Sequence, residues 1–206
     1  QTALTSAISQ SNKDIVGLIE LMLGKLPSQV INKKEKECAL ETAIKYKNYD
    51  VVSMLLDKFG PSIITTKVVQ LAVDRRDEKA LTILARLMPE EIACHHYEGT
   101  DSKGESIGDG PLLLLMVHFT YGYAEAAKIL VERMDADKLS YIQRDPKATA
   151  LNYALGSHLS EVAKLLIDKA GAKILKKWEE LDNTTQKVNQ DFGDNFLTLA
   201  YYLNDP

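Results

Sequence analysis

The sequence has little cysteine, no long apolar run and no excess of positive charge. Two cysteines in 206 residues are too few for a disulfide scaffold, which favours a reducing, cytoplasmic location. The longest fully apolar run, Leu112 to Val117, is too short to span a membrane. The net charge of -4 argues against a nucleic-acid partner, because binding to a phosphate backbone requires a basic face. A content of 45% hydrophobic residues is typical of a folded globular chain.

One apolar pattern recurs along the chain. An apolar residue is followed by apolar residues three and four positions later, which lie on one face of a helix. The five trios begin at Ile15, Val51, Ala80, Ala126 and Val162. Upstream of four trios, Leu or Val is followed three residues later by Ala, in the pairs Leu4/Ala7, Leu40/Ala43, Val69/Ala72 and Leu151/Ala154. The pattern predicts a short helix, a tight turn and a second amphipathic helix in each repeat, and such repeats bury their apolar faces by stacking.

These repeats resemble the ankyrin repeat, whose signature opens Thr-Pro-Leu-His-x-Ala. In the fifth repeat Thr149, Leu151 and Ala154 match that opening, and the second helix matches at Glu161, Val162, Lys164, Leu165 and Leu166. The signature Pro is replaced at Ala3, Ala39, Val68, Ala150 and Phe196, and the turn glycine at Lys47, Arg76 and His158. The intervals also stray from the family period of ~33 residues. Helical repeats of the tetratricopeptide or HEAT kind are the alternative architecture.

The resemblance implies an all-α, ankyrin-like helical-repeat solenoid with five helix-turn-helix repeats and a partial sixth. We expect a single domain, 1–206, with repeats near 2–37, 38–66, 67–110, 111–147, 148–194 and 195–206. We also expect the native protein to continue beyond this chain, at least at its C-terminal end. The charged run from Lys33 to Glu37 is expected to be a solvated turn. The segment from Lys173 to Leu181 is expected to be either a separate helix or an extension of the preceding one.

The segment 89–110 is rich in Gly, Ser and Asp and is predicted to be a mobile surface loop and a candidate site. It contains Cys94-His95-His96, with Glu98 and Asp101 nearby. A thiolate beside an imidazole is the pattern of an activated nucleophile, but a zinc site needs ligands that converge from separated pairs. We therefore expect a plain loop, no metal, no cofactor and no catalysis. His118 replaces the signature Ala of the fourth repeat and is expected to be a buried structural histidine.

The resemblance further implies that first helices line a concave face that binds a partner. The exposed residues that follow the Leu-x-x-Ala segments are the candidates, because Tyr and Arg are frequent binding hot spots. They are Lys45, Tyr46, Asp74, Arg75, Thr120, Tyr121 and Tyr202. We expect a monomeric domain that binds another protein through this face and the long loop, with no nucleic acid and no membrane span.

Two alternatives remain open at this point. One is an accessory or substrate-recruiting domain of a larger enzyme, with chemistry elsewhere or at Cys94. The other is a structural spacer. Irregular repeats of this type also resemble those of bacterial proteins that are injected into host cells, which implies the host cytoplasm as a second location.

Overall fold

The computed structural model describes residues 3–10, 13–25, 27, 30–100, 106–118, 123–144 and 147–182. Within these ranges the protein is mostly helical, with twelve α-helices, one 3-10 helix and four short strands. The predicted helical class is therefore confirmed, and the strands are an addition to it. The contacts group Gln1–Pro111 into an N-terminal unit and Leu112–Pro206 into a C-terminal unit. One continuous array over 1–206, with the repeat boundaries given above, stays a prediction.

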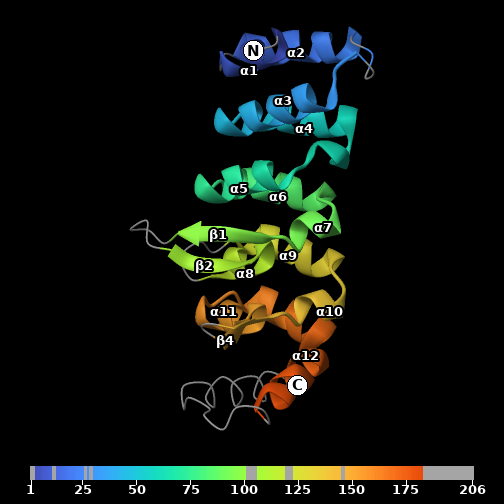
Figure 1. Cartoon of the computed structure of the whole chain (residues 1–206). Coiled ribbons are helices and arrows are strands. Elements are labelled where there is room, and N and C mark those ends of the chain that lie inside the picture. Colours follow the sequence, from blue (N-terminus) through green and yellow to red (C-terminus); the bar gives the residue numbers. More distant parts are fainter. Residues whose placement is uncertain are drawn as a thin grey trace. The chain divides into compact units, whose positions relative to one another are not determined.

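The N-terminal unit contains three helix pairs. They are α1 (Ala3–Ser9) with α2 (Lys13–Lys25), α3 (Lys33–Lys45) with α4 (Tyr49–Phe59), and α5 (Thr66–Asp74) with α6 (Glu78–Leu87). The short helix η1 (Pro61–Ile63) joins the second pair to the third. The first helices pack in chain order, α1 on α3 and α3 on α5, and the second helices do the same, α2 on α4 and α4 on α6 (Figure 1).

The pairs pack this way because each helix has one apolar face. On α4, Val51, Val52, Leu55 and Leu56 are at most 2% exposed. Burying one such side chain stabilises the fold by about 1.5–3 kcal/mol. A single helix pair could not remove this many side chains from water, so the neighbouring pair contributes the other half of each apolar contact.

The turns inside three helix pairs share one backbone conformation. Lys47, Arg76 and His158 have φ of 55°, 52° and 57°, in the left-handed region. In each case the next residue donates its N–H to the carbonyl of the signature alanine, Ala43, Ala72 or Ala154, at 2.9 Å. This is the Schellman closure of a helix, which usually places glycine at the left-handed position. Lys47, Arg76 and His158 therefore stand where helix ends usually carry glycine, at a conformational cost of about 1–2 kcal/mol each.

The charged run Lys33–Glu37 is helical, so the expected solvated turn is wrong. Asn32 caps α3: its side chain accepts a 2.9 Å bond from the Glu35 N–H, and the Glu35 carboxylate accepts a 3.2 Å bond from the Asn32 N–H. This capping box satisfies two N–H groups that would otherwise lack helical partners. The helix therefore begins ahead of the predicted start of the second repeat at residue 38.

The expected loop at 89–110 contains regular structure, so that prediction is also wrong. A short helix α7 (Glu90–Ala93) leads into strands β1 (His96–Thr100) and β2 (Ser106–Pro111), which pair antiparallel. The pairing satisfies main-chain N–H and C=O groups, and its register shifts between Gly99 and Thr100, where glycine tolerates an irregular backbone. Residues 101–105 lie outside the described part of the chain.

The C-terminal unit contains two further helix pairs and a second hairpin. Helices α8 (Leu112–Val117) and α9 (Ala124–Arg133) pack together, as do α11 (Ala150–Gly156) and α12 (Ser160–Asp182). Helix α10 (Ala136–Leu139) and strands β3 (Ile142–Arg144) and β4 (Lys147–Thr149) lie between them in the chain. Because α12 is continuous, the predicted segment from Lys173 is an extension of that helix.

Candidate functional site: a groove on the first helices

The N-terminal unit has a groove on the side of its first helices. It has a volume of about 420 Å³ and is lined by residues of α3, α5 and the α7–β1 segment, among them Glu41, Lys67, Gln70, Asp74, His95 and Tyr97. A second hollow of about 430 Å³ lies over α1 and α3 and is also lined by Glu41. On α5 the lining residues are three or four positions apart, so a single helical face forms that wall.

Gln70 fixes the position of β1 against α5. Its Nε2 donates to the Glu98 carbonyl oxygen at 2.9 Å, and its Oε1 accepts from the Glu98 N–H at 3.2 Å. The same Nε2 also donates to Oδ1 of Asp74 at 2.6 Å. One amide therefore pairs with both main-chain groups of a strand residue, which is the pairing that a neighbouring strand would supply.

An ion pair connects α3 to α5 at the groove. Lys67 Nζ lies 2.8 Å from Oε2 of Glu41, and both side chains come from successive first helices. The hydrogen bond to the Glu41 carboxylate and its negative charge raise the pKa of Lys67. Because the lysine is exposed, this pair contributes little to stability, and its main effect is to place a donor and an acceptor at fixed positions.

The inner wall of the groove is aromatic. Tyr97 is 1% exposed, and its hydroxyl donates to the Ile92 carbonyl oxygen at 2.6 Å. Burial raises the pKa of this phenol above its ordinary value of 10.0. The exposed His95 ring contacts Tyr97 edge to face, with 5.3 Å between the ring centroids. The groove thus combines a buried apolar wall with polar groups at its edges.

The cluster around Cys94 does not converge on one point. Cys94 follows α7, while His96 and Glu98 lie along β1; Asp101 lies outside the described residues. Over the part of the chain that the structure describes, no three His, Cys, Asp or Glu side chains are grouped to hold a metal ion. The prediction of a plain loop there is wrong for His96 and Glu98, which belong to β1, whereas Cys94 and His95 lie in the turn between α7 and β1.

The structure brings four of the predicted binding residues together. Lys45 and Tyr46 end α3, Asp74 and Arg75 end α5, and all four are exposed. Nη2 of Arg75 donates to the Lys45 carbonyl oxygen at 3.0 Å, and Nζ of Lys45 lies 5.9 Å from the centre of the Tyr46 ring. Asp74 also lines the groove. The other three, Thr120, Tyr121 and Tyr202, lie outside the described residues.

Sequence reasoning missed Glu41, Lys67 and Gln70. The available signal was the series Thr66, Gln70 and Asp74, which places polar side chains at intervals of four on α5. This series indicates an exposed helical face, but the bond from Gln70 to Glu98 depends on a strand that no periodicity predicted.

His118 is buried, as expected from its position in the repeat. It is 5% exposed, and its ring centroid lies 5.0 Å from that of Tyr153 on α11. Burial lowers the pKa of the imidazole, because the charged form loses its hydration. These contacts place His118 in the packing of the C-terminal unit.

Among the described residues, no helix is long and apolar enough to cross a membrane. Comparison of the sequence with protein-family models, with curated proteins and with solved structures found no match.

Proposed function

We propose that this chain is an ankyrin-like helical-repeat protein that binds a partner protein and catalyses no reaction itself. Its binding surface in the N-terminal unit is the groove over α3, α5 and β1, together with the turn residues at the ends of α3 and α5. The observation that carries the proposal is this groove, whose polar side chains are held by contacts between successive elements.

The side chains of the groove suit recognition of a protein segment. Lys67 and Asp74 offer charged donor and acceptor groups, and His95 and Leu71 supply ring and apolar surface beside them. Exposed Tyr46 lies close to Lys45, and aromatic residues beside cations are frequent among interface hot spots. Because Gln70 and Lys67 are already fixed by neighbours, binding orders few additional side chains and loses little entropy.

A recurring lysine contact supports the helical-repeat part of the proposal. Lys58 of α4 and Lys169 of α12 occupy the same position relative to their apolar trios. Lys58 donates to the Leu23 carbonyl on the preceding second helix, and Lys169 donates to the carbonyls of Val131 and Glu132 on α9, at 2.8 and 2.6 Å. The same bond between consecutive second helices in both units is expected for repeats of one kind.

The test uses the full chain as an affinity bait and compares two double variants. K67A/H95A removes two groove side chains, and D57A/L87A removes two exposed side chains of α4 and α6. We expect proteins retained by the wild type to be lost with K67A/H95A and kept with D57A/L87A, with far-UV circular dichroism unchanged in both. Equal retention by both variants would contradict the groove assignment.

A further inference from the structure

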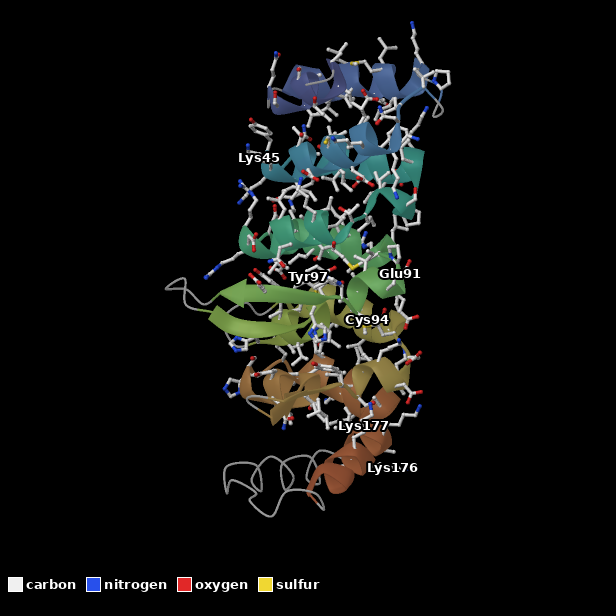
Figure 2. All side chains as sticks on the ribbon, viewed as in Figure 1. Lys45, Glu91, Cys94, Tyr97, Lys176 and Lys177 are labelled. Atoms are coloured by element: carbon white, nitrogen blue, oxygen red, sulfur yellow. The ribbon has the colours of Figure 1, made fainter. Side chains whose placement is uncertain are left out.

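Four basic side chains lie on the two turns that follow α3 and α5. Lys45 ends α3 and Lys47 lies on the turn that follows it, with Tyr46 between them, and Arg75 and Arg76 lie on the turn that follows α5. All five residues are exposed, and Lys45 lies at the outer end of α3 (Figure 2). We call these five residues the turn edge. The chain as a whole is acidic, with a net charge of -4, so this edge differs in sign from the molecule that carries it.

The backbone of the turn edge is strained where two of the cations attach. Lys47 and Arg76 both adopt the left-handed conformation, with φ of 55° and 52°. Glycine adopts it without a steric penalty, and Asn or Asp tolerates it better than Lys or Arg. Strained backbone conformations cluster at functional sites, where the surrounding structure holds them in place.

The helix dipole explains only part of this arrangement. A cation in the last turn of a helix is stabilised by the partial negative charge there, and Lys45 is in that position. Lys47 and Arg76 stand past the helix ends, where glycine would complete the same Schellman bonds without strain. The dipole therefore does not account for basic side chains at both left-handed positions.

A hydrogen bond connects the two turns, and two of the nearby carboxylates accept hydrogen bonds from residues outside the turn edge. The bond from Arg75 to the Lys45 carbonyl joins the turns at 3.0 Å. Asp74 accepts from Gln70, and buried Asp77 accepts from the Tyr49 hydroxyl. Asp50 and Glu78 are exposed in the first turns of α4 and α6, where a helix N-terminus favours negative charge.

We propose that the turn edge binds a carboxylate-rich segment of the partner protein, an inference that rests on the proposed function. Arginine presents a planar set of donors that matches a carboxylate, and the lysines add attraction with fewer constraints on direction. A nucleic-acid strand is the other polyanion that these cations attract, and the experiment below distinguishes it from an acidic protein segment.

Fluorescence anisotropy of the full chain with a labelled peptide of alternating glutamate and glycine tests the proposal. K47G/R76G removes two charges and retains the backbone conformation, so we expect the peptide Kd to rise about fivefold, as for two exposed ion pairs. K138Q/K176Q removes two exposed lysines of the C-terminal unit and serves as the control with equal net charge. We expect its Kd to match that of the wild type, and binding to weaken with added salt.

Three results would overturn the proposal. They are no binding of the peptide to the wild type, equal weakening in K138Q/K176Q, and tighter binding of an oligonucleotide of the same charge. None of these outcomes contradicts the proposed role of the groove, because that role is tested separately by the binding of the retained partner to the K67A/H95A variant. Partner binding lost in K67A/H95A but unchanged in K47G/R76G would therefore reject the acidic segment and keep the proposed function.

Discussion

The Tyr49 hydroxyl donates a 2.9 Å hydrogen bond to Oδ1 of Asp77, and Asp77 is 4% exposed. Tyr49 begins α4 and Asp77 caps α6, where the same Oδ1 accepts from the Ala80 N–H at 3.1 Å. The bond therefore ties together the starts of two successive second helices. Asp77 sits next to the strained Arg76, so this contact also fixes the turn that carries part of the turn edge.

Removal of this hydroxyl should destabilise the protein. Tyr49→Phe leaves a buried carboxylate oxygen with one donor fewer, which costs about 1–2 kcal/mol of unfolding free energy. The control Tyr46→Phe removes the hydroxyl of an exposed ring and should change stability by no more than about 0.5 kcal/mol. Urea denaturation of both variants at neutral pH measures the difference, and equal stability of the two would refute the role of the bond.

The same pair predicts a loss of stability at alkaline pH. Burial, with a further contribution from the bond to Asp77, raises the Tyr49 pKa from 10.0 to about 12. The unfolded chain loses this proton first, so the contribution of Tyr49 is complete below pH 10 and disappears as pH rises towards 12. Other groups with raised pKa values also make the unfolding free energy fall with increasing pH. The informative quantity is therefore the difference in unfolding free energy between the wild type and Tyr49→Phe at each pH. Between pH 8 and 11 we expect Tyr49→Phe to lose less unfolding free energy than the wild type. Parallel plots of unfolding free energy against pH would show that deprotonation of Tyr49 is not coupled to unfolding.

Glycine at a left-handed turn position should stabilise the fold. His158→Gly replaces a residue with φ of 57°, and the relief of steric strain exceeds the added flexibility of the unfolded chain. We expect a gain of about 0.5–1 kcal/mol in unfolding free energy. Lys176→Gly, at an exposed position inside α12, should instead lose about 1 kcal/mol. Thermal denaturation separates the two, and destabilisation by both substitutions would contradict the strain argument.

Burial of His118 predicts a weakening of the C-terminal unit in acid. The lowered pKa means that the unfolded chain takes up this proton at a higher pH than the folded one. The contribution of His118 is thus present above about pH 6.5 and is lost as pH falls below it. Between pH 7.5 and 5 we expect the unfolding free energy of His118→Gln, measured from denaturation curves, to fall less than that of the wild type. The exposed His158→Gln removes a surface histidine and serves as the control, and an equal change of the curves in both variants would contradict the assignment to His118.

Much of the helical framework could be predicted because it depends on local apolar spacing. The trio beginning at Val51 lies on the buried face of α4, and the alignment placed Lys47, Arg76 and His158 at turns where the backbone is left-handed. The start of α3 was missed because its charged residues give no apolar signal, although the cap at Asn32 and Glu35 is visible in the sequence.

The hairpin and the groove could not be predicted from periodicity. Strand β1 contains Gly99 and β2 contains two further glycines, so neither shows the alternation of a half-buried strand. Gln70 joins the site only because Glu98 of β1 lies beside α5. Contacts between residues so distant in sequence arise from tertiary packing, and the spacing of apolar residues along the chain does not predict them.

Site-specific photo-crosslinking tests the central claim, that a partner docks on the first-helix side of the N-terminal unit. A photoreactive phenylalanine analogue placed at Lys67 faces the groove, and one placed at Asp57 lies on exposed α4. After irradiation with the protein retained by the full chain, our account predicts a crosslinked product from position 67 and none from position 57. Crosslinking from position 57 alone, or equally from both positions, would contradict it.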